Sequence, residues 1–342
     1  MNPQLKFTWP ITGNTERLQD LESDLLNQHL SHAYLFSGPL EVGKFSAAKF
    51  FAKLILCAKR ACNQCEVCQK IAANAWSELV VADELWIENL NEDLTEISRK
   101  SNFNQMHRTR TPKAKTDTIG LPDLHEILSR IYVKHTSYQI FLVKNIERLT
   151  LEAANFFLKT LEEPPPRTIF LLTTSNLAKV LPTLISRCRL LVFDNVAERI
   201  ITTMLQQDFP ELSVTASKQI LHLALGKPIR AIRLARNPAA LQEFREYFAK
   251  LRSLFEQPDL VVKIQLADQL AASIPEIAKF LEALTYFLRS FLLARAREPK
   301  PASRYSRKKL LAIIQLLTET HSMIFQKNVN PRLALENLLF AI

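Results

Sequence analysis

Hydrophobic and polar positions along the chain follow two different patterns, and the change falls near residue 195. Before that point, short apolar runs such as YLFS, QIFLVKN and TIFLLTT alternate with segments whose apolar residues recur every three or four positions. Short apolar runs are typical of buried strands, whereas the three-to-four spacing is typical of amphipathic helices. Residues 1–195 are therefore predicted to form an α/β domain, with a parallel sheet between two layers of helices. Its helices are expected at residues 16–28, 45–57, 121–133, 151–161 and 181–186.

After residue 195 the strand pattern stops, and helical spacing continues to the end of the chain. Prolines interrupt this pattern at four places, and a proline favours the end of a helix at the residue before it. We therefore expect a small helical domain at residues 196–237 and a larger helical bundle at residues 238–342. No apolar run approaches the roughly 20 residues of a membrane span, so no membrane partner is expected. The interrupting prolines are Pro210, Pro238, Pro258 and Pro301.

The loop after the first expected strand has the form of a phosphate-binding loop with one position changed. The sequence GPLEVGKF carries Gly38, Gly43 and Lys44 of the pattern G-x-x-x-x-G-K-[ST], and Phe45 replaces the hydroxyl residue. In this pattern the glycines let backbone N–H groups close around phosphates, the lysine reaches the outer phosphates, and the hydroxyl binds Mg²⁺. The sequence therefore predicts a nucleotide-binding loop that lacks one metal ligand.

A second metal ligand is missing at the end of a neighbouring strand. A P-loop ATPase uses an acidic residue there to hold Mg²⁺, but the strand IFLV is followed by Lys144 and Asn145. The loss of two independent metal-binding positions predicts a chain that does not hydrolyse ATP. Whether the loop binds ATP or ADP is left open by the sequence. An active ATPase also stays open, with Glu147 and Ser46 in place of the lost ligands.

Four of the five cysteines lie within twelve residues, in the spacing C-x₄-C-x₂-C-x₂-C. Four thiolates can enclose one tetrahedral Zn²⁺, and such a closed shell is structural because no ligand position is left open for catalysis. We predict a structural zinc module inserted into the α/β domain at residues 57–68. An iron–sulfur cluster is the alternative, since C-x₂-C-x₂-C also occurs in ferredoxin-type sequences. The expected ligands are Cys57, Cys62, Cys65 and Cys68.

Charge adds a candidate partner. The 342 residues include 44 basic and 34 acidic side chains, and the excess gathers at residues 99–115 and 289–309. Such runs favour contact with an anionic partner such as nucleic acid, although solvated surfaces also carry them. A stand-alone zinc-containing nucleic-acid-binding protein is thus one open interpretation. Clustered cysteines and an N-terminus without a signal-peptide pattern favour a cytoplasmic location.

The segment after residue 150 carries strings that resemble a known family. The string AANFFLKTLEEPP at residues 153–165 and the string LPTLISRC at residues 181–188 are similar to the clamp-loader branch of AAA+ proteins. Within that branch the chain resembles the delta-prime family of bacterial DNA polymerase III subunits. The resemblance runs nearly end to end, and it includes the P-loop context, the four-cysteine insert, GKPIRA at 226–231 and NPRLALE at 330–336.

The resemblance implies an AAA+ domain at residues 1–195, a helical lid at 196–237 and a collar at 238–342 that joins subunits into a ring. It also implies a place in the DNA polymerase III holoenzyme, in a complex that opens a sliding clamp and sets it on primed DNA at the expense of ATP. The implied partners are ATPase subunits, a delta-like subunit, the clamp and the DNA.

Three positions acquire roles from this resemblance. Arg187, within the SRC motif formed with Ser186 and Cys188, matches an arginine finger that contacts ATP held by an adjacent subunit. Thr174 matches a polar sensor, with a turn-forming role as the alternative. Arg230 takes the approximate place of a second sensor arginine, with a solvated helix position as the alternative. The expected role is a non-hydrolysing, delta-prime-like subunit, and the alternative within the family is an active gamma/tau-like ATPase.

Overall fold

The computed structural model describes residues 5–72, 79–82, 118–129, 137–256, 259–297, 305–326 and 329–342. These residues form two compact units, Met1–Arg233 and Leu234–Ile342. The basic run at residues 99–115, and part of the run at 289–309, lie outside the described residues. No helix in the described ranges is long and apolar enough to cross a membrane.

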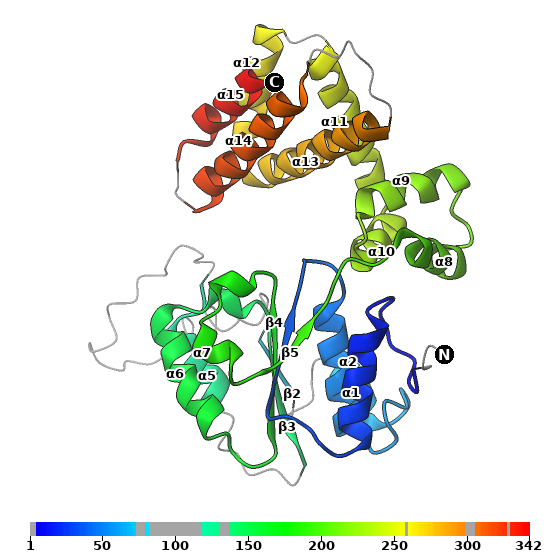
Figure 1. The fold of residues 1–342 in the computed structure, drawn as a ribbon, viewed down its shortest axis with the longest axis vertical. Helices are drawn as coiled ribbons and strands as arrows, with labels where there is room; N and C mark the ends of the chain where they lie inside the picture. The colour runs from blue at the N-terminus through cyan, green and yellow to red at the C-terminus, as the bar shows by residue number, and fades with distance from the viewer. Residues whose placement is uncertain are drawn as a thin grey trace, which may run out of the picture. The chain divides into compact units, whose positions relative to one another are not determined.

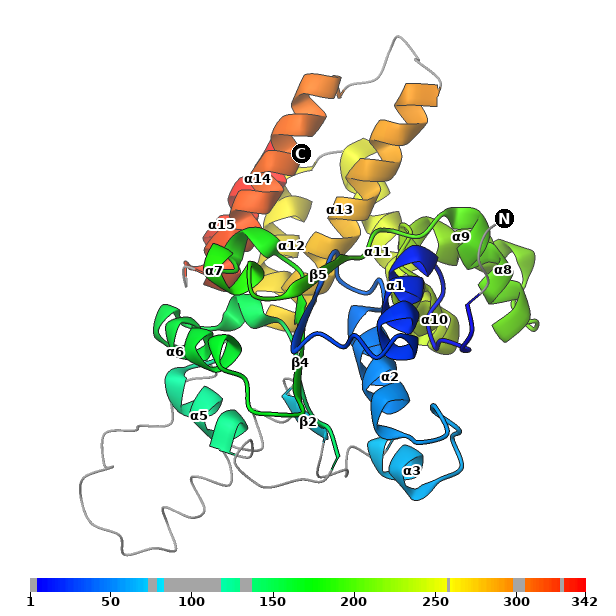
Figure 2. The same ribbon diagram turned by 60° about the horizontal axis from the view of Figure 1, so that its bottom comes forward.

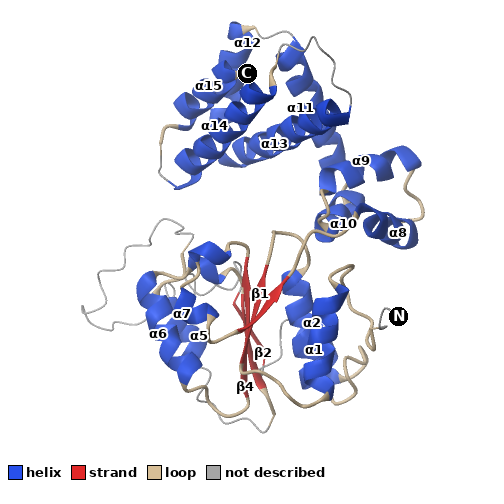
Figure 3. Ribbon diagram, in the orientation of Figure 1, coloured by secondary structure: helices blue, strands red, loops and turns tan. Residues whose placement is uncertain are grey.

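The first unit is built on a parallel sheet, drawn in red in Figure 3, and its strand order is β2-β3-β4-β1-β5. Every strand pairing is parallel, and β1, β3 and β4 are buried along their whole length. Such continuous apolar runs are what a strand needs when helices cover both faces of its sheet. The five strands are β1 (Ala33–Ser37), β2 (Leu79–Ala82), β3 (Gln139–Val143), β4 (Thr168–Thr174) and β5 (Arg189–Val192).

Helices cover both faces of this sheet, as Figure 1 shows. One core joins α1 and α2 to side chains such as Phe36 and Leu171, and a second core joins α5, α6 and α7 to side chains such as Phe170 and Leu172. Successive residues of β4 thus serve opposite layers, because strand side chains alternate between faces. The α/β fold and its helical continuation are confirmed. The helices are α1 (Thr15–Leu26), α2 (Lys44–Leu56), α3 (Glu66–Ala72), α5 (Leu121–Ser129), α6 (Leu151–Glu162) and α7 (Pro182–Ile185), with short 3₁₀ turns η2 (Ile146–Arg148) and η3 (Leu177–Lys179).

Three helices follow the sheet: α8 (Glu198–Asp208), α9 (Val214–Ala224) and α10 (Pro228–Arg236). Gly226 makes the turn between α9 and α10 with a φ of 78°, and a Cβ there would lie 2.9 Å from both Asn195 Cβ and Val196 O. The Val196 N–H donates to Gly226 O at 2.7 Å, which ties this turn to the end of the α/β layer. The three-domain division stays a prediction, since the described contacts separate only two units.

The second unit is helical throughout its described residues. Its core is formed by apolar side chains such as Leu251, Phe280, Leu284 and Leu338. Helix starts agree with local chemistry: Asp259 caps one helix, and Asn330 precedes another that has proline in its first turn. The helices are α11 (Pro238–Glu256), α12 (Leu260–Ala271), α13 (Ile274–Arg297), α14 (Arg307–Gln326) and α15 (Pro331–Ala341).

Candidate functional site

The predicted P-loop joins the end of β1 to the start of α2, at the edge of the sheet where the parallel strands end. This edge is called the carboxyl edge below. Gly38 and Gly43 have φ values of 142° and 102°, in the region that favours glycine. A Cβ at Gly38 would lie 2.0 Å from Phe193 O, so the loop passes too close to β5's exit for any side chain there. The loop geometry therefore requires both glycines.

The P-loop lysine is bound by its own loop. Lys44 Nζ donates to Gly38 O at 2.6 Å and to Pro39 O at 2.5 Å. The residue is 6% exposed, and burial lowers the pKa of its amine to about 8. The nearby Glu147 carboxylate opposes this shift by favouring the charged amine. The amine that would reach a phosphate is thus directed at carbonyl oxygens within the loop.

The two changed metal positions face one another. Lys144 Nζ lies 5.7 Å from the centroid of the Phe45 ring, within the range of a cation–π contact. The Phe45 ring therefore lies where a P-loop ATPase needs a hydroxyl, and the Lys144 ammonium group lies where it needs a carboxylate. Neither side chain can bind Mg²⁺, and the lysine repels it. The geometry at these positions does not fit a Mg²⁺-bound nucleotide.

Glu147, the alternative metal ligand, is bound to the end of β4. The backbone N–H of Ser175 donates to Glu147 Oε1 at 2.9 Å, and the Ser175 hydroxyl donates to the same oxygen at 2.5 Å. Thr174 is fully buried, and its hydroxyl accepts from the Asn176 N–H at 3.1 Å. Thr174 therefore shapes the turn after β4, while Glu147 connects this turn to η2.

Arg230 lies against the P-loop. Its side chain is 2% exposed, and its Nη1 lies 3.6 Å from Glu41 Oε2. Arg233, one helical turn later, holds Glu41 Oε1 at 2.9 Å. The backbone of α10 joins the same residue, because the Ile229 N–H donates to Glu41 O at 3.1 Å. The interpretation of Arg230 as a solvated helix residue is wrong, since the side chain is buried.

Arg187 lies between α7 and β5 and is held by two contacts. Its Nη1 donates to Thr183 O at 2.9 Å, and its Nη2 donates to Glu162 Oε1 at 2.6 Å. The side chain keeps 34% of its surface exposed. The SRC and LEEPP strings, separate in the sequence, therefore meet through this ion pair. Its two close contacts leave the guanidinium fixed but still open to solvent.

The neighbouring Arg189 has a different environment. Its guanidinium pairs with the carboxylate of Asp24, whose side chain is 7% exposed. The Tyr34 hydroxyl donates to the same carboxylate at 2.9 Å. Removing Arg189 would leave a buried charge without its cation, so this arginine stabilises the fold. Of the two arginines, Arg187 is the one free of such a structural task.

Sheet polarity separates Arg187 from the P-loop. Arg189 pairs with Tyr34 at the start of β1, and Val192 pairs with Ser37 at its end. Arg187 therefore lies at the amino edge of the sheet, where the strands begin. The loop glycine Gly38 lies four positions after Tyr34 along the strand direction, a span of about 13 Å. Because the loop and the arginine occupy opposite edges, Arg187 is directed away from this chain's own phosphate loop.

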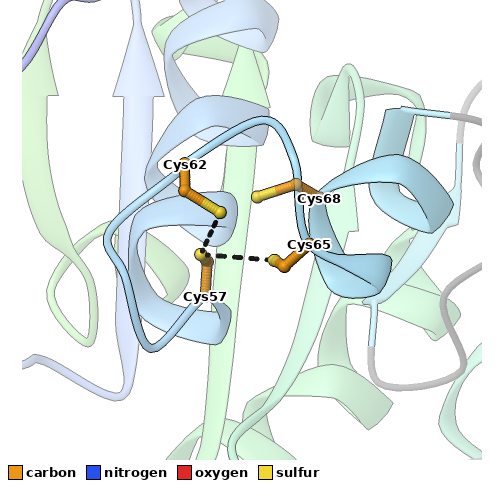
Figure 4. A group of neighbouring side chains, drawn as sticks. All are labelled: Cys57, Cys62, Cys65 and Cys68. Carbon is orange, nitrogen blue, oxygen red and sulfur yellow. Dashed lines mark hydrogen bonds between the residues drawn. The ribbon is translucent and has the colours of Figure 1, made fainter.

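The four predicted ligands of the zinc module come together in the structure (Figure 4). Their sulfur atoms all lie within 4.8 Å of one another. Cys57 Sγ lies 3.8 Å from Cys62 Sγ and 3.6 Å from Cys65 Sγ. Tetrahedral Zn–S bonds of about 2.3 Å place sulfur atoms about 3.8 Å apart, so the cluster fits this ion. The cluster joins α2, which ends just before Cys57, to α3, which contains Cys68; Figure 2 labels both helices.

Hydrogen bonds also prepare this cluster for a cation. Backbone N–H groups of Gln64 and Cys65 lower the pKa of the Cys62 thiol to about 6, which favours the thiolate form that binds metal. Cys188, the fifth cysteine, lies apart against the second core, and burial raises the pKa of its thiol to about 12. Cys188 is therefore an apolar neighbour of Arg187 and no part of the four-cysteine cluster.

Sequence reasoning missed two carboxylates, Glu41 and Glu162. Both belong to strings that had been singled out, the P-loop and LEEPP, but their arginine partners lie far away in the sequence. An acidic residue within a phosphate-binding loop was the available signal for Glu41.

The family described as DNA polymerase III, delta subunit, matches residues 13–197. The tau subunit of DNA polymerase III from Bacillus subtilis is 25% identical over 306 residues, which cover 83% of this chain and 49% of that protein. The delta' subunit from the same organism is 26% identical over 238 residues, covering 69% and 62%. The chain thus spans less than two thirds of either relative's length.

Among solved structures, a DNA polymerase III gamma subunit-related protein from Thermotoga maritima superimposes with a TM-score of 0.47 and 16% identity. The match covers 94% of this chain and 97% of that one. Because the family match at residues 13–197 takes in more than half of the chain, the protein belongs to the DNA polymerase III delta subunit family, and the resemblance to the clamp-loader branch is confirmed.

Proposed function

We propose that this chain is a non-hydrolysing, delta-prime-like subunit of a clamp loader, which supplies Arg187 to ATP bound by a neighbouring ATPase subunit. The observation that carries the proposal is the position of Arg187 at the amino edge of the sheet, partly exposed and away from its own P-loop. The altered metal positions at Phe45 and Lys144 support the absence of hydrolysis in this chain.

The contacts of Arg187 suit a group presented to another molecule. A guanidinium has five N–H donors in one plane. Glu162 and Thr183 each accept one of them, so three remain for the oxygens of a partner's phosphate. The charge of arginine persists at all relevant pH values, and its planar donors match phosphate geometry. Arginine fingers supplied in trans accelerate hydrolysis by roughly 10³–10⁵ where they act.

The other parts of the chain have supporting roles in this proposal. Zinc held by the four cysteines would stabilise the link between α2 and α3 and supply no catalytic chemistry. The second unit would join the chain to ATPase subunits and a delta-like subunit. With them it would load a sliding clamp on primed DNA in the cytoplasm, within the DNA polymerase III holoenzyme.

The test uses the complex reconstituted with the ATPase subunits of the same source. Arg187→Ala is expected to lower DNA-stimulated ATP hydrolysis at least tenfold, while the complex still assembles and the free energy of unfolding of the chain falls by only about 1 kcal/mol or less. Arg199→Ala, at an exposed arginine of α8, serves as the matched control. Unchanged hydrolysis in an assembled Arg187→Ala complex would overturn the proposal.

A second candidate is an active gamma/tau-like ATPase, which the similarity to the tau subunit favours. It requires Glu147 and Ser46 to hold Mg²⁺, although Glu147 already accepts two hydrogen bonds from Ser175. Mg·ATP turnover by the purified chain distinguishes the candidates. Turnover abolished by Lys44→Ala would favour the ATPase, and turnover no higher than that of the variant would favour the non-hydrolysing subunit.

A further inference from the structure

Glu41 places a negative charge inside the phosphate-binding loop. Glu41 has a backbone φ of 64°, in the left-handed region that is unfavourable for residues other than glycine. Such a conformation persists only where surrounding contacts hold it. The contacts in this structure come from α10, through the Ile229 N–H and the two arginines Arg230 and Arg233.

The two oxygens of the Glu41 carboxylate are divided between the arginines. Oε2 lies 3.6 Å from Arg230 Nη1, and Oε1 lies 2.9 Å from Arg233 Nη2. The Glu41 side chain is 21% exposed and that of Arg230 is 2% exposed, so water screens this pair little. A buried guanidinium needs an anion beside it, and within the described residues Glu41 supplies that charge.

We infer that Glu41 is a resident anion of the P-loop, which binds Arg230 and Arg233 in place of a nucleotide phosphate and thereby holds α10 against the loop. Lys44 agrees with this assignment, because its amine is likewise directed at loop carbonyls. The basic groups of the site thus have partners within the chain. Helix α10 needs no bound nucleotide to stay in place, and this holds whether or not Arg187 acts as a finger.

The test measures amide exchange at Ile229, whose N–H donates to Glu41 O. Glu41→Gln keeps the shape of the side chain and removes its charge. We expect exchange at Ile229 to become about tenfold to a hundredfold faster, as for loss of a charge-assisted bond. Amides of β4, such as that of Phe170, report global stability and show how much of the change is shared with global unfolding, which also breaks this contact. Glu198→Gln, at an exposed acid of α8, is the matched control.

Inorganic pyrophosphate then tests whether the carboxylate stands for a phosphate. Millimolar pyrophosphate should restore slow exchange at Ile229 in Glu41→Gln and leave the unmodified chain unaffected. Equal exchange in Glu41→Gln, Glu198→Gln and the unmodified chain would overturn the inference. Faster exchange that pyrophosphate does not reverse would also overturn it, because Glu41 would then be only an interface carboxylate.

Discussion

The ion pair between Glu162 and Arg187 gives the sharpest test of how the proposed finger is oriented. Glu162→Ala removes the carboxylate that holds Nη2 and leaves the second contact, from Nη1 to Thr183 O, in place. The guanidinium is then held at one point and can rotate. We expect ATP hydrolysis by the assembled complex to fall, because fewer Arg187 conformations reach the partner's phosphate.

The size of this effect follows from the exposure of the pair. Its side chains are 34% and 51% exposed, so the loss in free energy of unfolding should be only about 0.2–1 kcal/mol. Fixing an arginine side chain costs about 2 kcal/mol of rotamer entropy. Glu162 is one of the two contacts that fix Arg187, so without it about half of this cost has to be met when Arg187 binds the partner's phosphate. A cost of about 1 kcal/mol in the transition state corresponds to roughly fivefold slower hydrolysis.

The assay compares DNA-stimulated hydrolysis by complexes that contain Glu162→Ala or Glu163→Ala. Glu163 is the adjacent exposed glutamate and controls for charge at the end of α6. A fivefold loss specific to Glu162→Ala supports the positioning role. Hydrolysis that rises in Glu162→Ala would refute the reasoning, since the carboxylate would then be a competitor that withholds the arginine.

Three further predictions concern the chain alone. The Lys44 amine should titrate near pH 8 in NMR of the ¹³C-methylated protein, and an ordinary lysine midpoint would contradict the buried geometry. Between about pH 8 and an ordinary lysine pKa, the unfolded chain binds more protons than the folded chain. The free energy of unfolding, measured relative to that of Lys44→Met, should therefore rise with pH in this window. Asp24→Ala should lower the free energy of unfolding by about 2–4 kcal/mol in urea titrations, because Arg189 and Tyr34 lose a buried partner. Asp20→Ala, which removes an exposed carboxylate, is the control and should cost under about 1 kcal/mol. The purified chain should contain one zinc per molecule by elemental analysis, and Cys62→Ser should abolish that content and expose α3 to proteolysis; iron with a visible absorption band would instead favour the cluster alternative.

The sequence predicted those parts of the structure that depend on interactions between residues close together in the chain. The run TIFLLTT forms β4 because a strand buried on both faces favours apolar and β-branched side chains without polar alternation. The cysteine spacing predicted the cysteine cluster, since four side chains within twelve residues meet without help from distant elements. Gly38 and Gly43 were recognisable because only glycine accepts their backbone angles.

Contacts between distant segments could not be predicted in the same way. The pairing of Arg187 with Glu162 depends on how α6 and α7 pack against the sheet, which no periodicity of either helix reveals. Arg230 shows the same limit: its position suggested either a sensor or a solvated residue, whereas the structure buries it beside Glu41. Such pairs are decided by tertiary packing, so they follow from the fold.

The polarity of the sheet has a consequence for the number of working sites in an assembly. A loop at one edge and an arginine at the other give each subunit two unlike faces, so subunits arranged head to tail form heterologous interfaces. Under the proposed function, this chain would complete the catalytic centre of one neighbour through Arg187 but would offer no working centre to the other. Each copy would then interrupt a series of active interfaces, and an assembly with one copy would have a fixed starting point and a fixed direction.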